Sequence, residues 1–348
     1  MKVGIYKDTL SNRRGADIAV LALAEGLRER LGTTKNTKHT VVVFDKKDFE
    51  KRITEPWDVV ISTGTNELLD LYDHFSLRPL RSLRLKEQSL QFPFCVIQQF
   101  HTNPKSQFKR KHFLRNWKIR RALRHVDAIQ VLSERFVPQV ERYGAPVSVI
   151  GNWSEHHLTT QPPNHLTIIY PAAFAKGKNQ KLLIEAFAQV AAEFPDWRLR
   201  LLGRADGAYA DECRRLAART GIADKVYFAG FCDDLAQEYA CCAFVAFPSA
   251  SEGFGLVIAD AAAFAKPCVM VEDWIGTAAS DGGIVAEPTP RAYAQGLRRL
   301  MEDPGLRRRM GEAARKFASE RYSRERILDK WEALLKRNKT APSFASRR

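Results

Sequence analysis

The chain has 348 residues, more than one ordinary hydrophobic core accommodates, so two domains are expected. Hydrophobic residues make up 45% and charged residues 27%, which is typical of a folded chain and excludes a disordered one. The net charge of +15 indicates an anionic partner such as nucleic acid, a phosphorylated glycan or an acidic membrane surface.

The N-terminus and the cysteines indicate a cytosolic protein. The first residues, "MKVGIYKD", lack the apolar region of a secretory signal and are typical of a first strand. No apolar run reaches the roughly 18 residues that span a bilayer. The six cysteines show no C-x-x-C spacing, so neither a zinc site nor a disulfide framework is expected.

Short apolar runs alternate with amphipathic stretches along the chain. In the first half, strands are predicted at 2–6, 39–44, 58–62, 93–98 and 127–133, with a helix at 18–31. In the second half, strands are predicted at 166–172, 197–203, 225–230, 243–249 and 267–271, with helices at 179–194 and 211–221. Further helices are predicted at 291–303, 305–321 and 323–337. Such alternation is typical of βαβ units and parallel sheets.

The pattern therefore predicts an α/β protein with two tandem doubly wound, Rossmann-like domains. We expect an N-terminal domain over 1–155, a polar linker over 156–165 and a second domain over 166–318. Residues 319–348 are expected to form a helix that packs back on the N-terminal domain, followed by a frayed tail. Ligands of open α/β sheets bind at the carboxyl ends of the strands, so an interdomain cleft is the expected site.

One stretch has the residues of such a site. The apolar run "FVAF" at 244–247 is followed by Glu252, the turn Gly253-Phe254-Gly255 and, eight positions after Glu252, Asp260. A helix that starts near Gly255 would direct its unpaired N–H groups and its dipole at a phosphate. The two carboxylates would accept hydrogen bonds from sugar hydroxyls at either end of a nucleotide diphosphate sugar. The alternative is that both acids are ordinary helix residues of small effect.

The stretch "PSASEGFGLVIADAAAFAKPCV" resembles the retaining glycosyltransferases of family 4, which have the GT-B fold. "LLGRADG", "DKVYFAGFCDDLAQEYACCAFVAFPS" and "DPGLRRRMGEAARKFASERYS" follow the family in order and spacing. The resemblance covers 165–335 and, more weakly, 1–155. It implies that the N-terminal domain faces the acceptor and that the second domain binds a nucleotide-sugar donor, with no metal and no other cofactor.

The resemblance also implies roles for single residues. Glu252 would contact sugar hydroxyls and Asp260, one methylene shorter than the family's usual Glu, would hold the ribose. Lys178 matches the lysine that neutralises the diphosphate, whereas Ala173 occupies the place of its partner arginine. The predicted donor-binding residues, with Lys176 and Arg204 as candidates for the second positive charge, are Gly15, Arg14, Lys176, Arg204, Phe231, Gly253, Phe254, Gly255, Leu256, Val257 and Asp260.

In the first domain the resemblance is looser. The loop after the first strand has a single glycine, Gly15, where the family has a pair, and Arg14 stands in the other place. His101 directly follows a predicted strand, and the family often has a histidine there near the reacting carbon of the sugar. His101, Lys178 and Glu252 are therefore the predicted catalytic residues. Asn152 is expected to be a hinge residue.

A basic segment lies between Gln88 and Val126, which contains no Asp or Glu. Its basic side chains alternate with Phe108, Phe113, Leu114 and Trp117. Such a face suits an anionic membrane surface, with about 1 kcal/mol for each basic residue. A soluble acidic glycan or a merely solvated face are the alternatives, and RNA binding has only the charge in its favour. The predicted membrane or acceptor surface consists of Lys105, Lys109, Arg110, Lys111, Arg115, Trp117, Lys118, Arg120, Arg121 and Arg124.

Together these features predict a retaining, metal-independent glycosyltransferase that uses a nucleotide sugar. The expected acceptor is a glycan or glycolipid, as in lipopolysaccharide or other bacterial surface glycan synthesis, reached from the cytoplasmic face of the cell membrane. Two alternatives remain open: a non-transferring GT-B enzyme such as a sugar-nucleotide epimerase, and a binding protein that has lost catalysis. The nucleotide, whether UDP, GDP or ADP, is left open.

Overall fold

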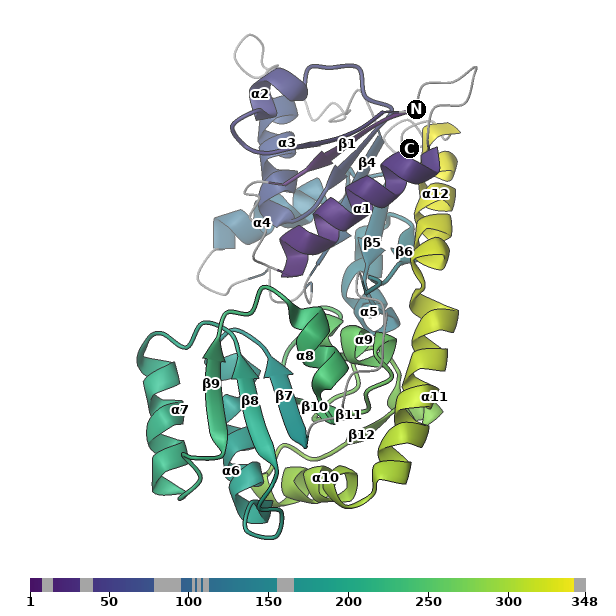
Figure 1. Cartoon of the computed structure of the whole chain (residues 1–348). Helices are drawn as coiled ribbons and strands as arrows, with labels where there is room; N and C mark the ends of the chain where they lie inside the picture. The colour runs from purple at the N-terminus through teal and green to yellow at the C-terminus, as the bar shows by residue number, and fades with distance from the viewer. Residues whose placement is uncertain are drawn as a thin grey trace. The chain divides into compact units, whose positions relative to one another are not determined.

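The computed structural model describes residues 1–7, 15–31, 40–77, 95–101, 104, 108, 113–154 and 166–340. The chain divides into two compact units (Figure 1). Unit 1 comprises Met1–Asn152 together with Arg324–Arg348, and unit 2 comprises Trp153–Ser323. Each unit is built on its own parallel sheet, which is the two-sheet architecture that the alternating sequence pattern predicts.

The sheet of unit 1 has six parallel strands in the order β2-β1-β3-β4-β5-β6. The strands are β1 (Lys2–Tyr6), β2 (Thr40–Phe44), β3 (Val59–Ser62), β4 (Cys95–Phe100), β5 (Ala128–Val131) and β6 (Val147–Val149). The helices of this unit are α1 (Gly15–Leu31), α2 (Phe49–Arg52), α3 (Thr65–Leu77), α4 (Phe113–Ala122), α5 (Val137–Val140) and α12 (Arg324–Thr340). Every residue of β3 and β4 is buried, as expected for parallel strands that helices cover on both faces.

The sheet of unit 2 also has six parallel strands, in the order β12-β11-β10-β7-β8-β9. Its strands are β7 (Thr167–Pro171), β8 (Arg198–Leu202), β9 (Val226–Gly230), β10 (Phe244–Phe247), β11 (Cys268–Met270) and β12 (Gly283–Val285). Its helices are α6 (Gln180–Val190), α7 (Ala208–Arg219), α8 (Leu235–Cys241), α9 (Leu256–Ala263), α10 (Pro290–Glu302) and α11 (Pro304–Tyr322).

The strand order reverses once in each sheet. In unit 1 the chain adds β2 on one side of β1 and then continues with β3 on the other side. In unit 2 it runs outward from β7 through β8 to β9, and then returns to place β10 on the opposite side of β7. Open α/β sheets bind ligands outside the carboxyl ends of the two strands at such a reversal. The fold therefore marks two places for polar side chains: the ends of β1 and β3, and the ends of β7 and β10.

Helix α12 completes unit 1 although it follows unit 2 in the chain. It packs on α1, where a Cβ atom on Gly26 would lie 2.8 Å from Leu328. Arg324 pairs with Glu29 at 2.6 Å, and Cys95 of β4 donates to the carbonyl of Asn338 at 2.7 Å. Helix α12 therefore contacts α1 and β4 through both apolar packing and polar interactions.

Candidate functional site

The carboxyl ends of β7 and β10 bring the two predicted catalytic residues of unit 2 together. Lys178 ends the short 3-10 turn Lys176–Lys178 after β7, and Glu252 lies in the loop after β10. The ammonium nitrogen of Lys178 lies 2.5 Å from Oε1 of Glu252. Both side chains are half-buried, with 31% and 16% of their surface exposed. A cation and a carboxylate are thus held in direct contact at the strand-order reversal of unit 2.

A buried hydroxyl fixes this ion pair. Ser249 has no exposed surface, and its Oγ donates a hydrogen bond of 2.5 Å to the same Oε1 atom of Glu252. The next backbone N–H, that of Ala250, donates to the carbonyl of Gly177 at 3.1 Å. Oε1 of Glu252 is therefore occupied by the protein, and the loop after β10 is tied to the turn that carries Lys178.

The turn before α9 depends on glycine. Gly255 has a φ of 88°, in the left-handed region, and it precedes the first helical residue of α9, Leu256. A Cβ atom at this position would lie 3.0 Å from the Cβ of Trp274. The ring of Phe254 is buried and packs edge-on against Tyr322 at 5.1 Å. Phe254 therefore anchors the turn inside unit 2 and can offer a ligand only its backbone.

Asp260 lies in the second turn of α9 and is half-buried. It faces Tyr239 of α8, whose side chain is fully buried. Burial, followed by the negative charge of Asp260, raises the pKa of Tyr239 above its ordinary value. The Tyr239 phenol therefore keeps its proton. The sequence did not indicate that Tyr239 lies next to Asp260, the residue predicted to hold the ribose.

The other predicted donor residues lie at the same edge of the sheet. Lys176 and Arg204 follow β7 and β8 and are exposed, and Phe231 follows β9 with 48% of its surface exposed. Ala173, at the place of the missing arginine, uses its carbonyl to accept a hydrogen bond from Gln180 at 2.9 Å. Because the strands are parallel, these residues lie at the same edge of the sheet as Lys178 and Glu252. Within the described part of the chain, neither Lys176 nor Arg204 contacts Glu252.

In unit 1, His101 directly follows β4, which ends at Phe100, two residues beyond the predicted strand end at 98. Both of its ring nitrogens are buried, and neither has a hydrogen-bond partner among the described residues. Burial, with a smaller contribution from the positive charge of Lys7, lowers the pKa of His101 to about 3. The imidazole is therefore neutral at neutral pH. Gly15 is the first residue of α1, and Arg14 lies outside the described residues.

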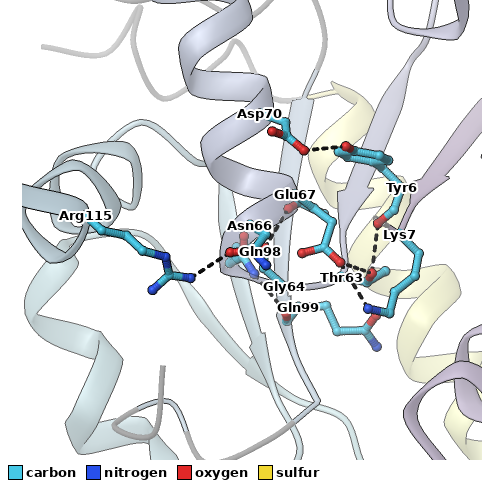
Figure 2. A network of polar contacts seen from close by, with 11 residues as sticks. Tyr6, Lys7, Thr63, Gly64, Asn66, Glu67, Asp70, Gln98, Gln99 and Arg115 are labelled. Carbon is cyan, nitrogen blue, oxygen red and sulfur yellow. Dashed lines mark hydrogen bonds and ion pairs between the residues drawn. The ribbon is translucent and has the colours of Figure 1, made fainter. Parts of the chain in front are cut away.

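A polar network that the sequence analysis did not identify lies at the ends of β1 and β3 (Figure 2). Lys7 follows β1, and its ammonium nitrogen lies 3.2 Å from Oε1 of Glu67 in the first turn of α3. Thr63 Oγ1 donates to the carbonyl of Tyr6 at 2.8 Å and lies 3.5 Å from the same Glu67 oxygen. The Tyr6 hydroxyl donates to Asp70 at 2.6 Å. The only signal in the sequence was an acid, Glu67, shortly after the strand end and Gly64.

Helix α4 carries the described part of the predicted membrane or acceptor surface except Arg124, which follows the helix. Phe113, Leu114 and Trp117 are 77%, 76% and 51% exposed. The guanidinium of Arg121 lies over the Trp117 ring at 5.4 Å, and Lys118 pairs with Asp73 at 3.1 Å. Arg115, Arg120 and Arg124 also lie within the described residues, whereas Lys105, Lys109, Arg110 and Lys111 lie outside them.

No group of three or more His, Cys, Asp or Glu side chains in the described ranges is placed to hold a metal ion. None of the helices in that part of the chain is long and apolar enough to cross a bilayer.

Comparison with solved structures defines the fold as GT-B. HepE of Anabaena, solved with UDP and glucose, superposes with a TM-score of 0.77 over 97% of this chain and 100% of that one, at 19% identity. Sucrose-phosphate synthase of Thermosynechococcus elongatus superposes with a TM-score of 0.73 over 97% of this chain and 98% of that one, at 18% identity. The two six-stranded parallel sheets are thus those of GT-B glycosyltransferases.

Residues 153–317, nearly all of unit 2, match the family model of glycosyl transferases group 1. An exopolysaccharide phosphotransferase of Streptomyces coelicolor is 32% identical over 222 residues, which are 60% of this chain and 23% of that protein. A D-inositol 3-phosphate glycosyltransferase of Streptomyces bingchenggensis is 32% identical over 166 residues, which are 44% of this chain and 36% of that protein. The matched part of this chain thus spans well under half of the length of either relative.

Proposed function

We propose that the protein is a retaining, metal-independent glycosyltransferase that takes a sugar from a nucleotide-sugar donor bound on unit 2. The observation that carries the proposal is the Lys178–Glu252 pair beside the Gly255 turn, at the strand-order reversal where GT-B sheets bind ligands. The family match over 153–317 and the UDP and glucose bound by HepE support the same assignment. UDP is therefore the first nucleotide to test.

The contacts of Lys178 and Glu252 indicate how they would act. Oε1 of Glu252 is held by Ser249 and Lys178, which leaves Oε2 to accept a hydrogen bond from a sugar hydroxyl. A diphosphate that enters the site would draw the Lys178 ammonium away from Glu252. That charge would then stabilise the leaving diphosphate as the bond between the sugar and its phosphate oxygen breaks.

The acceptor hydroxyl also has to lose its proton during the reaction. In the proposed retaining reaction the acceptor hydroxyl attacks the sugar carbon on the side that the diphosphate leaves. The leaving phosphate oxygen takes the proton of that hydroxyl, so no enzyme-bound intermediate forms. The protein contributes position and charge: Lys178 and the turn 253–256 hold the leaving group in place.

Donor binding and turnover test the proposal directly. Wild-type protein is mixed with UDP-, GDP- and ADP-sugars, and thermal stabilisation identifies the donor. Release of the nucleoside diphosphate is then followed for Lys178→Ala and for the control Lys181→Ala, which removes a nearby lysine that is paired with Glu212. We expect Lys178→Ala to reduce release at least a hundredfold, as loss of a charged transition-state contact does, and Lys181→Ala to have little effect.

Two results would overturn the proposal. One is that no nucleotide sugar stabilises the protein. The other is that Lys178→Ala and Lys181→Ala are equally active. A donor sugar that is isomerised without transfer to water or to an acceptor would favour the epimerase alternative.

On the acceptor side, we propose that α4 docks on an anionic membrane surface and that the acceptor is a glycan or glycolipid of a bacterial cell surface, such as a lipopolysaccharide precursor, reached from the cytoplasmic side. Exposed Phe113 and Trp117 next to basic side chains support this. Such a surface offers both apolar insertion and attraction to acidic lipid headgroups.

A further inference from the structure

Tyr170 lies near the carboxyl end of β7, the strand between β10 and β8 in the sheet of unit 2. Its side chain is only 1% exposed, and its ring packs edge-on against that of Phe247, with 6.0 Å between the ring centroids. The sequence pattern gives this residue no role beyond that of a strand residue. A buried tyrosine needs a partner for its hydroxyl, and the identity of that partner indicates what the residue does.

The partner is the backbone of Lys178. The hydroxyl of Tyr170 donates to the carbonyl of Lys178 at 2.8 Å, so the strand holds the turn that carries the lysine. Burial, followed by the negative charge of Glu252, raises the pKa of Tyr170 well above its ordinary value. The phenol therefore keeps its proton at neutral pH and remains a donor to this carbonyl.

The turn around Lys178 is held in an unusual backbone conformation. Asn179, the next residue, has a φ of 58°, in the left-handed region where residues other than glycine are uncommon. The carbonyl of Gly177, the preceding residue, accepts from the N–H of Ala250 at 3.1 Å. Lys178 thus lies between a residue tied to the loop after β10 and a left-handed residue, and its own carbonyl is tied to β7.

Both ends of the Lys178 side chain are then fixed. The backbone contacts set the direction in which the side chain leaves the turn, and Oε1 of Glu252 meets its ammonium nitrogen at 2.5 Å. A lysine side chain is a flexible four-carbon stem, so a contact this close depends on where the stem starts. Ala173 carries no charge at the place of the expected arginine, which makes the placement of the Lys178 charge more important.

We propose that Tyr170 is the positioning residue for Lys178. Its buried hydroxyl holds the Lys178 backbone so that the ammonium group is directed at Glu252. Within the proposed function, on which this part of the inference rests, the same hydrogen bond directs the ammonium group at the diphosphate of the donor. Tyr170 itself touches no reacting atom and acts only through the lysine.

A double-mutant cycle tests the positioning without any ligand. The variants are Lys178→Met, Glu252→Gln and the two together, each made in the wild-type chain and in Tyr170→Phe, with urea unfolding as the measurement. Tyr170→Phe should reduce the coupling free energy between Lys178 and Glu252 by about half or more, because the ammonium group is no longer held at the carboxylate.

Tyr293→Phe is the matched control for this cycle. Tyr293 is fully buried in the same unit, and its hydroxyl donates to the carbonyl of Val269 at 2.6 Å. The control therefore removes the same chemical group from the same kind of contact. It should lower the stability of unit 2 about as much as Tyr170→Phe does, but it should leave the coupling of Lys178 with Glu252 unchanged.

Binding of UDP, measured by calorimetry, extends the test to the proposed function. Tyr170→Phe should raise the Kd for UDP about tenfold, whereas Tyr293→Phe should leave it within about twofold. In a chain that already carries Lys178→Met, adding Tyr170→Phe should change the Kd by less than about twofold, because the lysine through which it acts is gone. The two tyrosine variants each lack a single hydroxyl, so they keep the test valid if Lys178→Met or Glu252→Gln does not fold.

Three results would overturn the inference. The first is equal coupling of Lys178 with Glu252 in the presence and absence of the Tyr170 hydroxyl. The second is a loss of coupling of the same size in Tyr293→Phe. The third is an equal rise of the Kd for UDP with and without Lys178, which would make Tyr170 a general support of the fold. If the coupling falls as expected but UDP does not bind, the positioning of Lys178 stands and the proposed function fails.

Discussion

Ser249 connects the two charged residues of the unit 2 site. It has no exposed surface, it hydrogen-bonds Glu252, and it directly precedes the residue whose N–H holds the turn of Lys178. A residue of this kind acts by positioning others. Its contribution should therefore appear in turnover more than in the stability of unit 2.

We predict that Ser249→Ala lowers kcat about tenfold, because Oε1 of Glu252 loses a donor worth about 1–2 kcal/mol and the carboxylate turns away from the sugar. Affinity for the free nucleoside diphosphate, which has no sugar, should stay within about twofold. Ser251→Ala, at an exposed position two residues on, is the control. Steady-state kinetics with the identified donor and calorimetry with the nucleoside diphosphate make the comparison. A drop in both quantities by the same factor would indicate a general structural role instead.

His101 should make the protein sensitive to acid. Its pKa is about 3 in the folded protein and 6.5 in an unfolded chain, so below pH 6.5 the unfolded chain binds a proton that the folded protein does not. Stability from this residue is complete above pH 6.5 and is lost as the pH falls toward 3, by about 1.4 kcal/mol per pH unit. We predict that the urea midpoint of wild-type protein falls more steeply than that of His101→Gln between pH 6.5 and pH 4.5. Parallel curves would contradict the buried, neutral histidine.

At the scale of elements, the turn before α9 combines backbone strain with close packing. Gly255 and Gly221 both have a positive φ, 88° and 73°. A Cβ atom on Gly255 meets Trp274 at 3.0 Å and Ile258 at 3.3 Å, whereas one on Gly221 meets nothing within 4 Å. The two positions therefore separate the effect of the left-handed conformation from the effect of packing.

We predict that Gly221→Ala costs about 1–2 kcal/mol, the cost of placing a side chain in the left-handed region. Gly255→Ala should cost more than that and should also weaken donor binding, because α9 has to shift away from Trp274. Urea denaturation and donor titration measure the two effects. Equal costs for both variants would mean that the turn has room for a methyl group.

Helix α4 buries Ile119 and Ala122 but exposes its large apolar side chains Phe113, Leu114 and Trp117. We predict that Phe113→Ser with Trp117→Ser reduces binding to vesicles that contain acidic phospholipid by more than tenfold, since inserting each aromatic ring contributes about 1.5–3 kcal/mol. Tyr227→Ser, which removes a 47% exposed ring from unit 2, is the control. Co-sedimentation at low and at high salt is the measurement. Unchanged binding by the double variant would exclude α4 as the docking element.

The element pattern of the sequence was sufficient to predict the fold, because buried parallel strands such as β3 are continuous apolar runs that helical stretches separate. The site was only partly predictable. Ser249 and Glu252 are neighbours in sequence, but Glu252 meets Lys178, 74 residues away, only because β10 lies beside β7. The resemblance assigned both residues to one donor site but did not predict their contact. No feature of the sequence predicted the pair of Lys7 with Glu67. The pair forms because β3, which leads to Glu67, lies next to β1 in the sheet.

For the whole molecule, the two units differ in how the chain forms them. Unit 2 is one continuous segment, Trp153–Ser323, whereas unit 1 needs two segments, Met1–Asn152 and Arg324–Arg348. We predict that a fragment of residues 153–323 folds alone and binds the nucleoside diphosphate within about tenfold of the full chain. A fragment of residues 1–152 should be much less stable, because the surface of α1 at Gly26 loses Leu328. Circular dichroism and calorimetry on both fragments check this. A folded and stable 1–152 fragment would show that α12 is dispensable.

The late position of α12 sets an order of events during translation. The ribosome makes the first 152 residues early, but the helix that seals their sheet emerges only after every residue of unit 2 has been polymerised. Nascent domains ordinarily mature from the N-terminus onward. In this protein the order is reversed: unit 2 can reach its native state while the first 152 residues of unit 1 still lack α12.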